Sequence, residues 1–236
     1  MMPQASDHAP NAGRSAAEID AADITARILL ETESVLFRPE DPFTFTSGLR
    51  SPVYIDCRRL ISFPRARRKL MDLAAELIER RAGFETIDAI AGGETAGIPF
   101  AAWIADRLSL PMIYVRKQPK GFGRNAQIEG ELKEASRILL VEDLASEGTS
   151  KLNFVRAIRQ AGAHTDFAFV IFNYGIFRQI ETSLAAESIT LLALANWWDV
   201  AEMAERLGRF APGQYEAVES FLNDPTAWSK AQTSRR

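Results

Sequence analysis

The stretch ILLVEDLASEGTSK (residues 138–151) decides the fold that we expect for this chain. It begins with four apolar residues, which is typical of a strand buried on both faces of a parallel sheet. Two adjacent acids, Glu142 and Asp143, end this run, and a short loop of small polar residues and glycine leads into a helix. Such a loop and helix N-terminus bind phosphate, while neighbouring carboxylates accept hydrogen bonds from a diol. The stretch therefore predicts a ribose-phosphate site at the end of a buried strand.

Apolar strand-like runs alternate with amphipathic helical stretches around this segment. We expect strands at 87–91, 111–115, 137–141, 167–172 and 189–194. We expect helices at 24–32, 66–81 and 98–108, a further helix from the 142–150 loop to about residue 161, and a helical C-terminal part. The alternation predicts an α/β fold with a mostly parallel sheet flanked by helices.

The remaining segments predict the organisation of the chain. Residues 43–57 resemble two strands around turn residues, which indicates a small N-terminal hood. Small polar residues at both ends indicate segments without a packed core. We expect four parts: a disordered leader (1–20), the hood (21–60), the α/β core (61–223) and a loose tail (224–236).

Three polar or glycine-rich loops follow the expected strands, at residues 92–97, 117–130 and 142–150. The carboxyl ends of parallel strands meet at one edge of a sheet, where ligands bind. The middle loop carries the cations Arg116, Lys117 and Lys120 among glycines, and such a loop suits a mobile lid over a diphosphate. The sequence therefore predicts an active site at this edge.

Composition excludes several other classes of protein. The formal net charge of −3 gives no support for broad nucleic-acid binding or a membrane-surface role. Cys57 is the single cysteine, and the two histidines lack metal-ligand spacing. No apolar run is as long as a membrane span, and the N-terminus lacks the apolar segment of a secretory signal, so we expect a cytoplasmic protein.

The acid–acid–phosphate segment resembles the signature of the type I phosphoribosyltransferases. Three further segments are similar to those of the orotate phosphoribosyltransferases: FTFTSGLRSPVYID (43–56), AGGETAGIPFAAWIADRLSLP (91–111) and RKQPKGFG (116–123) followed by IEG (128–130). The resemblance implies the type I fold and transfer of the phosphoribosyl group from phosphoribosyl pyrophosphate (PRPP) to orotate, giving orotidine 5′-monophosphate and pyrophosphate in pyrimidine biosynthesis. It also implies Mg²⁺ held through PRPP and water without direct protein ligands, and a homodimer whose lid reaches the neighbouring subunit.

The same resemblance implies a role for each matching residue. Glu142 and Asp143 would bind the ribose hydroxyls. The 5′-phosphate would be held by Ser146, Glu147, Gly148, Thr149 and Ser150. Leu144 and Ala145 before them would also belong to the PRPP-binding residues. The pyrophosphate would be bound by Arg116, Lys117, Lys120, Gly93, Glu94 and Thr95. Ser146 would also lie near the orotate, and the catalytic residues would be Lys120, Asp143 and Arg116. Apart from the resemblance, we expect Thr46, Ser47 and Arg50 of the hairpin to contact orotate in place of the family's usual Arg.

The chain departs from the family's common pattern at several positions. Thr46 and Ala96 stand where many members have Lys, Phe122 stands where His is frequent, and Glu147 adds a negative charge to a phosphate loop. Tyr174 stands where many members have the Arg that grips the orotate carboxylate. Two alternatives therefore stay open: a phosphoribosyltransferase for another base, and a non-catalytic regulator that binds PRPP. A dinucleotide-binding protein is set aside, because no G-x-G-x-x-G follows a first strand.

Overall fold

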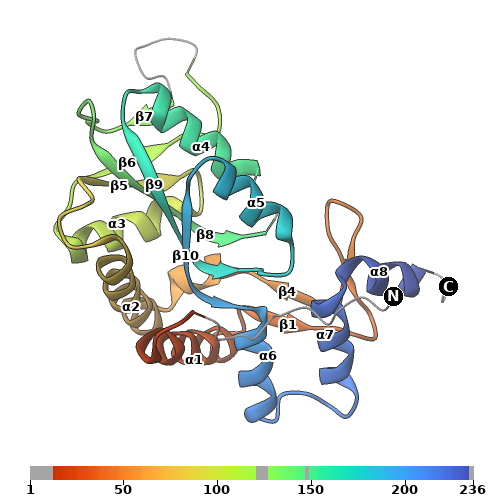
Figure 1. Cartoon of the computed structure of the whole chain (residues 1–236). Coiled ribbons are helices and arrows are strands. Elements are labelled where there is room, and N and C mark those ends of the chain that lie inside the picture. The colour runs from red at the N-terminus through yellow and green to blue at the C-terminus, as the bar shows by residue number, and fades with distance from the viewer. Residues whose placement is uncertain (1–12, 121–126, 147–148, 234–236) are drawn as a thin grey trace. The chain divides into compact units, whose positions relative to one another are not determined.

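The computed structural model describes residues 13–120, 127–146 and 149–233, and it divides into two units (Figure 1). The sheet unit comprises residues 60–194. The helical unit comprises residues 13–59 together with the segment that starts at 195. We expected residues 195–223 in the α/β core, whereas the structure groups them with the N-terminal residues. The 3-10 helix η1 (Cys57–Ser62) joins the first part of the helical unit to the sheet unit.

The sheet unit is built on a six-stranded sheet with the order β10-β9-β8-β5-β6-β7. Its strands are β5 (Ala89–Gly93), β6 (Met112–Val115), β7 (Ile128–Glu129), β8 (Arg137–Ala145), β9 (His164–Asn173) and β10 (Thr190–Asn196). Strand β5 pairs in parallel with β6 and β8, β8 pairs in parallel with β9, and β7 runs antiparallel to β6. The expected mostly parallel sheet is confirmed.

Helices flank this sheet because its strands are apolar on both faces. They are α2 (Pro64–Ala82), α3 (Gly97–Leu108), α4 (Thr149–Gln160) and α5 (Arg178–Ala186). Ile138 and Leu140 of β8 share a buried cluster with Phe154 of α4 and Ile180 of α5. Alternate residues of a strand face one side of its sheet, so the side chain of Glu142 follows Ile138 and Leu140 on the α4 side.

Strand β8 is longer than the sequence predicted, and this changes the place of the two acids. We expected the strand to end at residue 141, with Glu142 and Asp143 just beyond it. The structure continues the strand to Ala145, because Glu142, Leu144 and Ala145 all pair with β9. The acids are therefore buried members of the strand, and each is 8% exposed.

The helical unit contains two short strand pairs. Strand β2 (Phe43–Thr44) pairs with β3 (Arg50–Ser51), and β1 (Val35–Phe37) pairs with β4 (Val53–Ile55). The predicted hairpin is therefore present between residues 43 and 51. Its second half does not continue to residue 57 in one ladder, since Pro52 has no N–H to donate and β4 pairs with β1, a strand that we did not predict.

Helix α1 (Ala16–Glu31) begins within the segment expected to be a disordered leader. Ser15 caps it, with its side chain accepting from Glu18 N while the Glu18 side chain accepts from Ser15 N. Ser15 and Glu18 have the spacing of a capping box, although the polar, alanine-rich composition around them favoured disorder. Residues 1–12 lie outside the described part of the chain.

The C-terminal part of the chain is helical, as predicted, but its last described residues are more ordered than we expected. Helices α6 (Trp197–Arg206), α7 (Gln214–Asn223) and α8 (Pro225–Thr233) follow β10, so the loose tail expected from residue 224 is wrong for the described residues. Asp224 caps α8, because Ala227 N donates to Asp224 Oδ1 at 2.8 Å, and Pro225 occupies the first helical position. An Asp followed by Pro is a signal for the start of a helix, although the polar composition of this segment favoured a loose tail.

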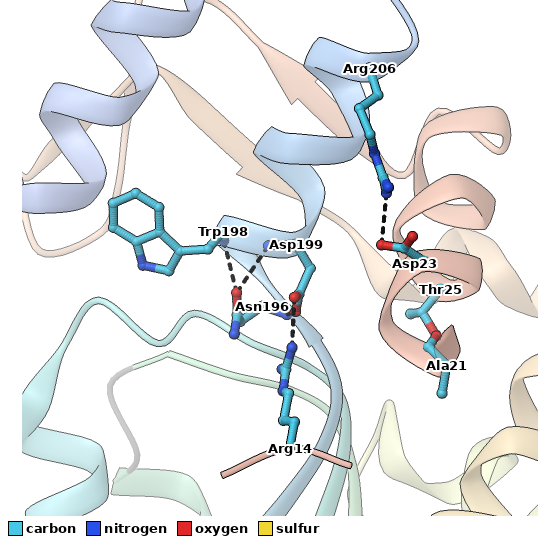
Figure 2. A network of polar contacts seen from close by, with 8 residues as sticks. All are labelled: Arg14, Ala21, Asp23, Thr25, Asn196, Trp198, Asp199 and Arg206. Carbon is cyan, nitrogen blue, oxygen red and sulfur yellow. Dashed lines mark hydrogen bonds and ion pairs between the residues drawn. The ribbon is translucent and has the colours of Figure 1, made fainter. Parts of the chain in front are cut away.

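Two ion pairs join α6 to α1 and to the residue before the α1 cap within the helical unit, as Figure 2 shows. Arg14 Nη1 lies 2.6 Å from Asp199 Oδ1, and Arg206 Nη2 lies 2.7 Å from Asp23 Oδ1. Asn196 caps α6 by accepting from the N–H groups of Trp198 and Asp199. The Asn-Trp-Trp-Asp stretch at 196–199 therefore starts a helix and fixes its packing. Across the described residues, none of the helices combines the length and the apolar character that crossing a membrane requires.

Candidate active site

The candidate site lies at one edge of the sheet unit, where β5, β6 and β8 end. These three strands are neighbours in the order β8-β5-β6 and run parallel to one another, so their carboxyl ends lie side by side. Each strand end delivers one of the predicted motifs: the Gly93–Thr95 turn, the Arg116–Lys120 lid base and the Glu142–Ser146 segment. The structure therefore brings these three motifs together, as the sequence predicted.

Glu142 lies at the centre of this edge, against two glycines of the neighbouring turn. A Cβ at Gly93 would overlap Glu142 Oε1, and it would lie 2.8 Å from Glu142 Cδ. A Cβ at Gly97 would lie 2.9 Å from the same Oε1. The Glu142 side chain thus lies against both glycines. A Cβ at Gly97 would also overlap the backbone oxygen of Val141, so both positions need glycine for packing.

One oxygen of Glu142 has no hydrogen-bond partner among the residues that the structure describes. This buried Oε1 contrasts with Oε2, which lies 3.9 Å from the Nζ of Lys151. A buried carboxylate oxygen without a partner is costly, and such atoms mark places where a ligand or a water binds. Asp143, the next residue, is equally buried. The Glu142 oxygen therefore offers a hydrogen-bond acceptor at this edge of the sheet.

Burial shapes the protonation of Glu142 and of its neighbour Lys151. Burial raises the pKa of Glu142 to about 7; the Lys151 ammonium opposes this rise, the Asp143 carboxylate adds to it, and the Lys117 ammonium opposes it. Burial lowers the pKa of Lys151, and the two carboxylates act against that change. The Glu142 carboxylate and the Lys151 ammonium are 3.9 Å apart, beyond hydrogen-bond distance. The effect of burial on each pKa is therefore larger than the effect of their mutual attraction.

The phosphate loop connects β8 to α4. Tyr174 N donates to Ala145 O at 2.8 Å, which fixes the start of the loop against the end of β9. Leu144, Ala145 and Ser146 are described, and the backbone of Thr149 and Ser150 forms the first turn of α4. Glu147 and Gly148 lie outside the described residues. A helix N-terminus aimed at this edge favours an anion there.

The turn after β5 is tied to the base of the lid. Glu94 N donates to Val115 O at 2.9 Å, and Glu94 Oε2 accepts from Lys117 N at 2.7 Å. The peptide bond between Glu94 and Thr95 is cis. Ala96 precedes α3 and supplies no side-chain cap. The predicted pyrophosphate residues Gly93, Glu94 and Thr95 therefore lie beside the predicted lid cations.

The lid base is a two-stranded ribbon whose cations are paired with one acid. Arg116 N donates to Gln127 O at 2.8 Å and Gln127 Nε2 donates to Arg116 O at 3.1 Å, so the two ends of the lid meet. Glu129 lies 3.5 Å from Arg116 and forms an ion pair with Lys120. The Lys120 contact is the main reason that the pKa of Glu129 is lowered. Residues 121–126, which include Phe122, lie outside the described residues.

The predicted orotate contacts of the hood belong to the helical unit. Thr46 and Ser47 are exposed in the turn between β2 and β3, where Phe45 N donates to Leu49 O at 2.9 Å. Arg50 is held by α8: its N–H donates to Ser229 Oγ at 2.9 Å and its Nη1 donates to Gln232 O at 3.2 Å. The guanidinium thus has a structural contact of its own, which the sequence could not reveal.

Sequence reasoning missed two residues of this site. Lys151 closes the deciding stretch, and Glu129 belongs to one of the family motifs, but neither was predicted to have a role. Lys151 is 3% exposed, which is unusual for a lysine, and its spacing from the acids was the available signal. Nothing in the sequence indicated that Glu129 pairs with the lid cations, because the pairing depends on the β6–β7 register.

Comparison with known proteins agrees with this geometry. The phosphoribosyl transferase domain family matches residues 60–174. The orotate phosphoribosyltransferase of Dinoroseobacter shibae is 57% identical over 94% of this chain and 97% of that protein. The enzyme of the same name from Rhizobium rhizogenes is 51% identical over 88% of this chain and 90% of that protein.

Solved structures show the same relationship. The crystal structure of orotate phosphoribosyltransferase from Aeropyrum pernix is 32% identical, covers 79% of this chain and 99% of that chain, and has a TM-score of 0.67. Leishmania donovani UMP synthase is 27% identical, covers 90% of this chain and 44% of that chain, and has a TM-score of 0.74. With its site geometry, its relatives and its fold in agreement, this chain belongs to the orotate phosphoribosyltransferase family.

Proposed function

We propose that the sheet edge described above is where this chain carries out its family's reaction. As an orotate phosphoribosyltransferase, it transfers the phosphoribosyl group of PRPP to orotate and releases pyrophosphate. Glu142 and Asp143 bind the ribose hydroxyls, residues 146–150 hold the 5′-phosphate, and the lid cations with the Gly93–Thr95 turn hold the pyrophosphate. The observation that carries this proposal is the buried oxygen of Glu142, which lies against the glycine turn and has no hydrogen-bond partner in the described part of the chain.

The chemistry needs charge stabilisation more than a nucleophile. Breaking the anomeric C–O bond leaves positive charge on the ribose and negative charge on the departing pyrophosphate. Arg116, Lys117 and Lys120 lie at the strand end beside the glycine turn, so they are suited to stabilise the leaving group as its charge develops. A closed lid would exclude water from the reacting ribose.

We propose Mg²⁺ as the metal that accompanies PRPP. The described residues contain no cluster of three or more His, Cys, Asp or Glu side chains that could hold a metal alone. Mg²⁺ suits such a site, because it keeps several waters and is usually bound through one or two carboxylates plus substrate phosphates. The PRPP phosphates and water would hold the ion, and it would supply neutralising charge to the pyrophosphate.

The proposed orotate contacts include fewer residues that match the family's pattern than the proposed PRPP contacts do. Tyr174 replaces the common Arg; its ring is buried and stacks with Phe177 at 6.0 Å. We propose Ser146, Thr46, Ser47 and Arg50 as orotate contacts. Arg50→Ala should raise the KM for orotate and leave the dissociation constant of PRPP unchanged. An unchanged KM for orotate would remove Arg50 from the site and leave it only its contact with α8.

We propose a homodimer in which the lid acts at the neighbouring subunit's site. The test mixes two inactive variants, Lys120→Ala and Asp143→Asn, and allows their subunits to exchange. If the lid crosses between subunits, a mixed dimer contains one intact site and recovers activity. If the lid serves its own subunit, every site in the mixture stays defective and no activity returns. Sedimentation of the wild type measures the dimer directly.

We also propose a cytoplasmic location, and cell fractionation tests it.

The first experiment measures the fall in orotate absorbance with enzyme, Mg²⁺ and PRPP. Uracil, hypoxanthine and adenine serve as parallel acceptors, and chelation by EDTA tests the metal. Turnover of orotate alone, lost with EDTA, is the expected result. Turnover of a different base would keep the ribose-phosphate site and reject orotate. PRPP binding without any turnover would favour a regulatory role instead.

A further inference from the structure

We infer that Lys151 is a positioning residue that works through Glu142. Its buried ammonium keeps the Glu142 carboxylate available to the ribose hydroxyls and ties the start of α4 to the end of β8. This inference deepens the proposed function, because it assumes that Glu142 binds the ribose of PRPP. It concerns a residue to which neither the motif nor the proposed mechanism gives a role.

The position of the Lys151 side chain is the first part of the argument. Lys151 is the third residue of α4, and its side chain turns back to β8, where Nζ donates to Leu144 O at 2.6 Å. Leu144 and Lys151 lie on either side of residues 145–150, so this hydrogen bond closes the base of the phosphate loop. A lysine that is only 3% exposed is costly to bury, which argues for a purpose beyond solubility.

Electrostatics supply the second part. Glu142 and Asp143 are both buried at the same strand end, and two adjacent carboxylates oppose each other's ionisation. The groups that act on Glu142 come from three elements: Asp143 of β8, Lys151 of α4 and Lys117 at the lid base. Of the two cations, Lys151 is the one that lies within 4 Å of a Glu142 oxygen in the described part of the chain.

The consequence for PRPP follows from hydrogen-bond strength. A carboxylate accepts hydrogen bonds from hydroxyl groups that are roughly twice as strong as those to a neutral acceptor. Without Lys151, the protonated form of Glu142 would be favoured further, and the ribose hydroxyls would lose a charged acceptor. Lys151 therefore affects ribose binding without touching the ribose.

A double-mutant cycle tests this coupling. The dissociation constant of PRPP with Mg²⁺ is measured by calorimetry for the wild type, Lys151→Met, Glu142→Gln and the double variant. Methionine keeps the length of the side chain and removes its charge. We expect Lys151→Met to weaken PRPP binding about tenfold in the wild type, and by less than about twofold when Glu142 is already neutral. An equal loss in both backgrounds would overturn the inference and leave Lys151 a structural role only.

Two further comparisons of PRPP binding test the coupling even if Lys151→Met does not fold, and they test the role of Glu142 separately. If Lys151→Met alone does not fold, the double variant removes both charges of the pair, a change that proteins often tolerate. A difference of about tenfold between the double variant and Glu142→Gln would still overturn the coupling. Equal PRPP binding by the wild type and Glu142→Gln would instead reject the proposed role of Glu142 itself, so the two failures are distinguishable.

The pH dependence of PRPP binding is a readout that a structural role would not move. Removing the Lys151 cation should shift the midpoint of the acid limb to higher pH, because Glu142 then holds its proton more strongly. The titration of the PRPP phosphates is common to both proteins and cancels in the comparison. An identical midpoint in the wild type and Lys151→Met would overturn the inference.

Discussion

The Gly93→Ala substitution tests the packing at the centre of the site. The backbone of Gly93 is not in the left-handed region, so the cost of the change comes from contacts. The added Cβ would lie 2.7 Å from Phe154 Cε2 and 2.8 Å from Glu142 Cδ, and it would overlap Glu142 Oε1. Carbon atoms in contact normally lie about 3.5–4.0 Å apart, so Glu142 and Phe154 must each move by roughly 1 Å.

The expected magnitudes follow from this displacement. Overpacking of this kind costs about 1–3 kcal/mol of folding stability. For a protein of this size, each kcal/mol lowers the melting temperature by about 2–4 °C. Because the displaced group is Glu142, the ribose should also lose a hydrogen bond to a charged group, worth about 1.5–3 kcal/mol, and PRPP should bind about 10- to 100-fold more weakly.

Gly162→Ala is the matched control for the loss of stability. Gly162 lies before β9, at the opposite edge of the same sheet, with φ +88° and only Glu134 Cγ, at 3.6 Å, near the added Cβ. Its left-handed backbone should cost about 1–2 kcal/mol without any effect on PRPP. Calorimetric titration with PRPP and thermal unfolding of both variants complete the assay. If Gly93→Ala binds PRPP as tightly as Gly162→Ala, Glu142 is not placed as we describe.

Three other predictions concern charged residues. Lys120→Ala should lower kcat about 10²- to 10³-fold with little change in KM. An unchanged kcat would exclude a transition-state role for this lysine. Lys133→Ala is the control, because Lys133 is an exposed lysine. The Glu129 carboxylate competes with pyrophosphate for the lid cations, so the Glu129→Gln variant should bind pyrophosphate more tightly than the wild type. Inhibition of the variant by pyrophosphate measures this, and weaker inhibition than in the wild type would contradict it. Arg137 hydrogen bonds lower the pKa of Asp88 to about 2, so its ionised form stabilises the fold above the ordinary value of 3.8. Asp88→Asn should therefore melt below the wild type at pH 7, with the gap closing as the pH falls toward about 2.

Local patterns in the sequence were sufficient to predict the sheet and the three loops at its edge. A buried parallel strand needs apolar residues on both faces, and a phosphate loop needs small residues before a helix, so both requirements appear in consecutive residues such as 138–151. The helix starts at Ser15 and Asp224 are also local signals, because each capping residue and the N–H group that it accepts from lie within one turn of the chain.

The tertiary structure alone decided how the residues of the site act on one another. The contact of Glu142 with Gly93, the burial of Lys151 and the pairing of Glu129 with Lys120 join residues from different strands and helices. Such contacts depend on strand order and register, which a single sequence does not display. The chain by itself thus determined which chemical groups reach the sheet edge, whereas packing determined their charge and partners, because desolvation and distance depend on the folded surroundings.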